Sequence, residues 1–188
     1  MKSWKKLSTK VLLDHPRMKI SQDTVELPNG EVKEWPFWDS TDSAMMVGMT
    51  EDKKLILIRQ YRYLVGDEVI EFPAGALHEG EEIEQGLKRE FEEETGYQAV
   101  SFQKLCSVYE TYGQLNRQIH IYFSPNVVKT HQHLDRGEEG YEDIEVVLID
   151  FDEVVRMALA DNIPAMGCSL AVLMLKEQIE TGKIKLAN

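Results

Sequence analysis

Residues 75–97 read GALHEGEEIEQGLKREFEEETGY, and this stretch says most about the fold and chemistry of the 188-residue chain. Within it, residues 82–95 have the spacing of an amphipathic helix, and Gly96 is a residue favoured just beyond a helix C-terminus. The apolar side chains share one face of that helix: Ile83, Leu87 and Phe91. The segment therefore predicts a helix with one face packed on a core.

Two glutamates of this helix fall on its apolar face. A helical wheel places Glu90 and Glu94 beside the apolar residues, whereas Glu92 points to the opposite side and Glu93 lies at the edge. Two carboxylates one turn apart, at about 6 Å, repel by about 3 kcal/mol at an effective dielectric of about 20. A bridging divalent cation would offset this repulsion, and oxygen ligands of this kind suit Mg²⁺ or Mn²⁺.

A solvated acidic face, stabilised by Lys88 and Arg89, is the alternative interpretation of the same glutamates. The flanking residues favour the cation site. Residues 73–75, Pro-Ala-Gly, form a rigid and then flexible turn that lets backbone carbonyls approach a metal. Arg89 also lies four residues before Glu93, so its guanidinium can orient that carboxylate.

The composition excludes several classes of protein. Hydrophobic residues make up 43% of the chain and charged residues 29%, and no apolar run is long enough to span a bilayer. The net charge of -12 disfavours nucleic acid as a partner but allows a phosphate-containing substrate bound through cations. Cys106 and Cys168 fit neither a disulfide framework nor a metal motif, and no signal peptide is recognisable, so a cytoplasmic protein without a membrane partner is expected.

The order of elements predicts an α+β fold. Strands are expected at 19–27, 32–38, 44–49, 54–59, 68–72, 100–109, 118–128 and 143–150, and helices at 82–95, 152–160 and 169–181. Strands and helices mix without regular βαβ alternation, which favours a mixed-sheet sandwich over a doubly wound fold. We expect two parts: a small antiparallel β ribbon in residues 1–42 and the main domain in residues 43–188.

One motif makes the interpretation specific. Gly75 is followed after five residues by Glu81 and, after seven more, by residues 89–97, REFEEETGY. This pattern resembles the Nudix box, and every fixed position of the box is matched. The resemblance implies the α/β/α sandwich of Nudix hydrolases, a Mg²⁺ cofactor (with Mn²⁺ possible), and a role for Glu81 in bracing the loop through Arg89.

The same resemblance assigns the metal ligands. It makes Glu90 and Glu94 direct ligands and the backbone carbonyl of Ala74 a further one. Glu93 would be a ligand or would orient the attacking water.

The resemblance extends beyond the box to one branch of the family. Residues 27–30 (LPNG), 59–63 (RQYRY), 68–75 (EVIEFPAG) and 142–146 (EDIEV) are similar to ADP-ribose and nucleoside-diphosphate-sugar pyrophosphatases. In that branch the N-terminal ribbon packs across a homodimer, and the small-molecule substrate lies at the interface. A homodimer formed through residues 1–42 is therefore expected.

Several side chains are candidates for substrate contacts. The guanidinium groups of Arg62 and Arg59 suit a diphosphate, although Arg59 could equally be a surface charge on an edge strand. Trp35 and Trp38 are candidates for stacking on the base, although dimer packing would explain these aromatics equally well.

One stretch departs from the pattern of the branch. Members that prefer ADP-ribose carry a Ser-Pro-Gly-like turn followed by a glutamate, whereas residues 109–117 read YETYGQLNR. Asn116 or Arg117 stands near the expected acid. A GDP- or ADP-hexose therefore rivals ADP-ribose as the substrate.

A glutamate outside the box is expected to accept the proton of the attacking water. The glycine-containing loop 137–142 supplies it, with Glu142 as first choice, Glu139 as second and Glu138 as a solvated charge. The products would be a nucleoside monophosphate and a sugar phosphate. A dinucleoside polyphosphate hydrolase and a non-catalytic ADP-ribose-sensing Nudix domain are the alternatives.

Overall fold

The structure, a computed structural model, describes residues 2–134 and 142–186. The chain divides into two compact units. Unit 1 comprises Met1–Thr41 and Tyr109–Gln118, and unit 2 comprises Asp42–Val108 and Ile119–Asn188. None of the helices in the described part of the chain is both long and apolar enough to cross a bilayer.

Unit 1 is built on an antiparallel sheet of three strands. They lie in the order β1 (Lys5–His15), β2 (Met18–Glu26) and β3 (Val32–Trp38), and Gly30, with a φ of 87°, closes the turn between β2 and β3. The register of β1 on β2 shifts between Val11 and Leu13. Leu12 and Leu13 therefore interrupt the alternation of apolar and polar residues that marks a regular strand. This irregularity explains why periodicity alone does not reveal β1 as a single long strand.

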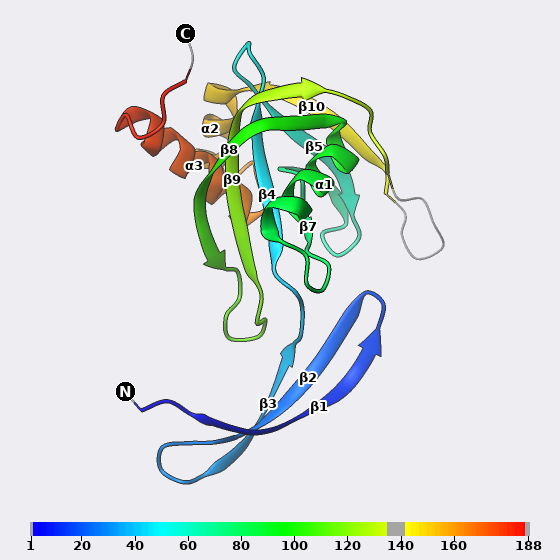
Figure 1. Cartoon of the computed structure of the whole chain (residues 1–188), viewed down its shortest axis with the longest axis vertical. Helices are drawn as coiled ribbons and strands as arrows, with labels where there is room; N and C mark the ends of the chain where they lie inside the picture. The colour runs from blue at the N-terminus through cyan, green and yellow to red at the C-terminus, as the bar shows by residue number, and fades with distance from the viewer. Residues whose placement is uncertain (1, 135–141, 187–188) are drawn as a thin grey trace. The chain divides into compact units, whose positions relative to one another are not determined.

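Unit 2 contains a seven-stranded mixed sheet (Figure 1). The main path runs β10-β5-β4-β9-β8, with β6 paired to β5 and β7 paired to β4. The strands are β4 (Ser43–Met49), β5 (Lys54–Arg62), β6 (Asp67–Glu71), β7 (Ala74–Ala76), β8 (Tyr97–Tyr109), β9 (Gln118–Lys129) and β10 (Ile144–Asp150). Strands β4 and β9 are parallel, whereas β5 runs antiparallel to β4, β6 and β10, so the expected mixed sheet is confirmed.

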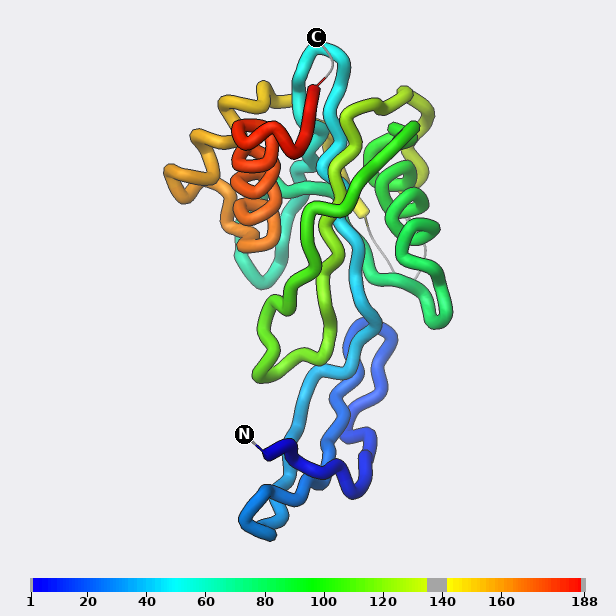
Figure 2. The backbone as a smooth tube through the Cα atoms, turned by 60° about the vertical axis from the view of Figure 1, so that its left-hand side comes forward, coloured from blue at the N-terminus to red at the C-terminus, as the bar shows by residue number. Residues whose placement is uncertain are grey.

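Helices cover both faces of this sheet. Figure 2 shows α1 (Ile83–Thr95) on one face and α2 (Phe151–Leu159) with α3 (Met166–Glu180) on the other. Every residue of β4 is buried, because its alternate side chains face the two helical layers. The expected α/β/α sandwich is therefore confirmed.

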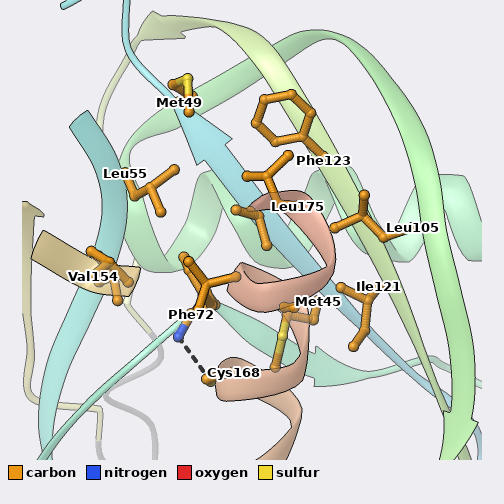
Figure 3. Packing of buried hydrophobic residues seen from close by; sticks show 14 of the residues in the cluster. Met45, Met49, Leu55, Phe72, Leu105, Ile121, Phe123, Val154, Cys168 and Leu175 are labelled. Atoms are coloured by element: carbon orange, nitrogen blue, oxygen red, sulfur yellow. Dashed lines mark hydrogen bonds between the residues drawn. The ribbon is translucent and has the colours of Figure 1, made fainter. Parts of the chain in front are cut away.

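The larger core lies between the sheet and the helices α2 and α3. Figure 3 shows Met45, Phe72 and Leu175 packed together there, and the backbone N–H of Phe72 donates to Sγ of Cys168 at 3.2 Å. The smaller core lies under α1 and includes Met46 and Phe91. The two cores fix the positions of all three helices on the sheet.

The helix boundaries follow the predictions with one difference. Helix α3 begins at Met166, three residues before the expected start at Ser169. Its N-cap is Ala165, and the Ser169 hydroxyl instead donates to the carbonyl of Ile163 at 3.2 Å. A serine that bonds back to an earlier carbonyl resembles an N-cap in sequence but lies inside the helix.

Candidate metal and hydrolytic site

The short strand β7 and the helix α1 bring Gly75 against Glu90. An ideal Cβ added to Gly75 would lie 2.0 Å from Cδ of Glu90 and 2.2 and 2.3 Å from its two carboxylate oxygens. The side chain of Glu90 is only 17% exposed. The strand passes this close to the helix because β7 pairs with β4, in the register Ala44↔Gly75, under the face that α1 covers.

Glu94 is the most deeply buried carboxylate of the helix. The residue is 6% exposed, and its Oε2 accepts a hydrogen bond from the backbone N–H of Ala74 at 2.9 Å. Burial, with the charge of Glu90 as the next cause, raises the pKa of Glu94 to about 8. Burial also raises the pKa of Glu90, although Arg89 opposes this shift. The wheel placed both residues on the inner face, and the structure agrees.

Arg89 connects the loop to the helix. Its Nε and Nη2 donate to the two carboxylate oxygens of Glu81, each at 3.0 Å, as the sequence led us to expect. Its Nη1 lies 2.7 Å from Oε1 of Glu90 and 3.2 Å from Oε2 of Glu93. The hydrogen bonds from Arg89 are the main reason why the pKa of Glu81 is lowered to about 2.

The two proposed bases differ in what the structure describes. The negative charge of Glu142 contributes to raising the pKa values of Glu90 and Glu94, so its carboxylate lies within electrostatic reach of both. Glu139 and Glu138 lie outside the described residues. The role of either glutamate as the base stays a prediction.

The donors fit a hard divalent cation. Glu90 and Glu94 present carboxylates with raised pKa values from one helical face, beside the backbone of Ala74 and Gly75. Within residues 2–134 and 142–186, no three Asp, Glu, His or Cys side chains converge on one point, and Glu93 is turned to Arg89 and 42% exposed. Glu90 and Glu94, with backbone carbonyl oxygens nearby, therefore supply only part of a cation's ligands. This suits a cation that keeps water and phosphate ligands.

The two arginines named for the diphosphate each have an acidic partner. Nη1 of Arg59 lies 2.9 Å from Oε2 of Glu145 across β5 and β10. Nε and Nη2 of Arg62 lie 2.8 and 2.6 Å from Oε1 of Glu71. Neither side chain is buried, so each guanidinium has surface left for another anion.

Sequence reasoning did not single out Glu71. Besides Arg62, Gln60 donates to the same oxygen at 2.8 Å, and the charge of Glu71 contributes to raising the pKa of Glu94. Its only signal in the sequence is its place in residues 68–75, where the branch resemblance was noted. Glu71 thus pairs with Arg62 of β5 and also acts electrostatically on Glu94.

The two tryptophans lie in unit 1. Trp35 is 44% exposed and meets Trp4 edge to face, with ring centroids 5.4 Å apart. The guanidinium of Arg117 lies 5.7 Å from the ring centroid of Trp38. Trp38 also lines a cavity of about 430 Å³ together with apolar and polar neighbours: Ile20, Pro36, Phe37, Thr111, Gln114 and Leu115.

The stretch that departs from the branch pattern is fastened to the end of β3. Asn116 donates to Asp39 at 2.9 Å and accepts from the backbone N–H of Ser40 at 3.0 Å. Arg117 bonds Glu110 at 2.9 Å. Both residues that stand near the expected acid therefore have structural partners within unit 1.

Comparison with known proteins identifies the family. The family model described as the NUDIX domain matches residues 39–167. The chain belongs to the Nudix family. It is 26% identical over 163 residues to the ADP-ribose pyrophosphatase of Bacillus subtilis (strain 168), covering 86% of this chain and 87% of that protein. It is 27% identical to the methanol dehydrogenase activator of Bacillus methanolicus, covering 93% of each.

Two further comparisons concern a nucleotide-sugar pyrophosphatase and the fold. The GDP-mannose pyrophosphatase of Escherichia coli (strain K12) is 32% identical over 114 residues, or 57% of this chain and 59% of that protein. A solved structure described as an ADP compounds hydrolase superposes with a TM-score of 0.80 at 17% identity, covering 97% of both chains, and so supports the fold. The chain is a Nudix hydrolase with relatives among the ADP-ribose and nucleoside-diphosphate-sugar pyrophosphatases, and divalent cations are the general cofactors of this family.

Proposed function

We propose that this Nudix hydrolase cleaves the diphosphate linkage of ADP-ribose or a related nucleoside-diphosphate sugar with the help of Mg²⁺. The observation that carries the proposal is the pair of inward carboxylates, Glu90 and Glu94, held against the backbone of Ala74 and Gly75. Like charges held together on a buried face are unfavourable unless a cation or a proton balances them.

The box residues hold the cation and keep its ligands in place. Glu90, Glu94 and the Ala74 carbonyl are the proposed ligands, and Glu93 is a further ligand or orients the attacking water. When bound there, the cation supplies a Lewis acid that neutralises charge on the diphosphate oxygens. Arg89 restricts the carboxylates of Glu90 and Glu93, so little reorganisation is needed on binding.

Glu142 accepts a proton from the water that attacks one phosphorus, with Glu139 as the second choice for this role. The negative charge of Glu142 helps to raise the pKa values of Glu90 and Glu94. These two carboxylates therefore hold protons readily until a cation binds. The products are a nucleoside monophosphate and a sugar phosphate.

The relatives and the arginines support this substrate class. Two of the relatives act on ADP-ribose and on GDP-mannose, as their names state. Arg59 and Arg62 bind the diphosphate, and the acidic partner of each keeps its guanidinium in place before substrate arrives. Trp35 and Trp38 stack on the base.

A homodimer through unit 1 is part of the proposal. Large apolar side chains are exposed on its strands and just before β1: Trp4, Leu7, Val11, Leu12, Leu13, Met18, Val32 and Trp35. Many large apolar side chains exposed on one small sheet are typical of a protein interface. We expect light scattering to give the mass of a homodimer. Changing Leu12 and Leu13 to serine should reduce this mass to that of the monomer.

A substrate panel tests the function. ADP-ribose, GDP-mannose, ADP-glucose, NADH and diadenosine polyphosphates are incubated with Mg²⁺, and the products are identified by phosphorus NMR. We expect a nucleoside monophosphate and a sugar phosphate from at least one nucleotide sugar. Cleavage of diadenosine polyphosphates alone would favour the dinucleoside polyphosphate alternative, and no cleavage at all with tight ADP-ribose binding would favour the sensing domain.

A further inference from the structure

The C-terminal end of α1 is capped by a distant segment of unit 2. The last carbonyls of a helix have no partner within the helix and need one elsewhere. Here the carbonyl of Glu93 accepts from the backbone N–H of His133 at 2.9 Å. The carbonyl of Glu94 accepts from the side-chain Nε2 of Gln132 at 2.6 Å. The turn of helix that carries two of the box glutamates thus depends on residues almost forty positions later.

The amide of Gln132 makes a second bond, to β10. Its Nε2 also lies 3.3 Å from the carbonyl of Ile144, the first residue of β10. One amide nitrogen carries two N–H donors and can serve both carbonyls. Ile144 follows Glu142 by two residues, so a single side chain joins the helix end to the strand that begins next to the proposed base.

Glu94 is consequently held at two points. Its carboxylate accepts from the N–H of Ala74, and its backbone carbonyl accepts from Gln132. We propose that Gln132 is a positioning residue that sets the separation between Glu94 on α1 and Glu142 before β10. This inference rests on the function proposed above and adds a residue outside the box to its machinery.

The backbone contacts of this segment are independent of the Gln132 side chain. The N–H of Thr130 donates to the carbonyl of Gly96 at 2.7 Å, and a Cβ on Gly96 would lie 2.7 Å from the backbone nitrogen of Gln132. Because these contacts use main-chain atoms, replacing the side chain of Gln132 leaves the segment seated on the helix. Gln132 is itself an exposed residue, so its replacement leaves no cavity.

The chain offers a matched control at the same end of α1. Nε2 of Gln98 donates to the two carboxylate oxygens of Glu92 at 2.8 and 3.0 Å. Gln98→Met therefore removes an amide with two hydrogen bonds near the helix terminus without touching Glu94 or β10. Gln132→Met removes the same group from the proposed position.

The experiment compares the two variants in the full-length protein. Thermal melting should show similar, small losses for both. Loss of a residue that supports metal ligands typically costs about 10–100-fold in metal affinity or activity. We therefore expect Gln132→Met to lower kcat on the best nucleotide sugar by about tenfold or more while KM changes less than about threefold. Mn²⁺ binding, followed by electron paramagnetic resonance without substrate, should weaken for Gln132→Met relative to Gln98→Met.

The outcomes separate this inference from the proposed function. If the wild-type protein hydrolyses a nucleotide sugar and both variants keep the same kcat, Gln132 is not a positioning residue. If the wild-type protein hydrolyses none, the proposed function fails, and Mn²⁺ affinity alone decides: equal affinities of the two variants overturn the inference. Should Gln132→Met not fold, Gln132→Asn, which keeps the amide but shortens its reach, takes its place with Gln98→Asn as control.

Discussion

The carboxylate of Glu90 occupies the space in which a side chain at position 75 would lie. The ideal Cβ of Gly75 would be 2.0 Å from Cδ of Glu90, far inside van der Waals contact. Gly75 is absent from the residues with positive φ, so its backbone does not require glycine for conformational reasons. The glycine at the start of the box is there because the helix presses a carboxylate against the strand.

Gly75→Ala should therefore damage the site more than the fold. The added methyl group displaces Glu90 from the strand, and we expect cation affinity and turnover to fall by about tenfold or more, as for other losses of ligand placement. Isothermal titration with Mg²⁺ and steady-state kinetics measure both effects.

Gly80→Ala is the control for that experiment. Gly80 lies in the loop between β7 and α1 with a φ of 77°, and a Cβ there would meet nothing within 4 Å. Its substitution strains the backbone by about 1 kcal/mol and should leave cation affinity unchanged. Equal cation affinities for both alanine variants would contradict the steric role of Gly75.

The buried carboxylate of Glu94 should make the cation-free protein less stable as pH rises. Its pKa is about 8 in the folded state, against 4.5 for the ordinary group, so the folded protein binds the proton more tightly than the unfolded chain does. This contribution to stability is fully present below pH 4.5 and is lost progressively as pH rises to about 8. Urea unfolding in EDTA between pH 5 and 8.5 measures it.

Two comparisons make the source of that pH dependence specific. Glu94→Gln cannot ionise, so its stability should vary less with pH over the same range, and its turnover should fall by orders of magnitude. Added Mg²⁺ should stabilise the wild-type protein most at the alkaline end, where the carboxylates are free of protons. An unchanged slope in Glu94→Gln would show that other groups cause the dependence.

Replacing the proposed base should affect the chemical step. Glu142→Gln is expected to lower kcat by about 100-fold or more, within the usual range for loss of general acid–base catalysis, with little change in KM. The pH profile of kcat should lose its acidic limb. Glu139→Gln is the parallel variant, and equal, mild losses in the two would show that neither glutamate is the base.

Gly96 should tolerate no side chain, for two separate reasons. Its φ of 67° is in the left-handed region, and a Cβ would lie 2.7 Å from the backbone nitrogen of Gln132. Gly182 has a similar φ of 72° but open space around it. Gly182→Ala should therefore cost about 1 kcal/mol in urea unfolding, and Gly96→Ala clearly more. Equal losses in the free energy of unfolding for the two variants would mean that the segment 130–133 moves away from the new methyl group without loss of stability.

The helix and its chemistry could be predicted because they are local. The inward placement of Glu90 and Glu94 follows from a period of 3.6 residues, which the sequence displays directly. The bond from Arg89 to Glu81 joins residues eight positions apart in one contiguous motif. The resemblance to the Nudix family also rests on that motif, and the comparisons confirm it.

Contacts between distant segments could not be predicted in the same way. No periodicity connects Gln132 with Glu94, and the pairing of Arg62 with Glu71 depends on the register of β5 on β6. The start of α3 was misplaced by three residues, and the bond from Ser169 to the carbonyl of Ile163 is seen only in the structure.

The sequence by itself determined the box and the inward carboxylates, because a helix repeats at a fixed interval along contiguous residues. Only the tertiary structure decided why Gly75 is glycine, what caps α1 and which acid pairs with Arg62. These features depend on how separate strands and loops pack on the sheet. Hydrogen bonds and steric contacts act only over a few ångströms, so they join residues that are close in space, whatever the separation of those residues in sequence.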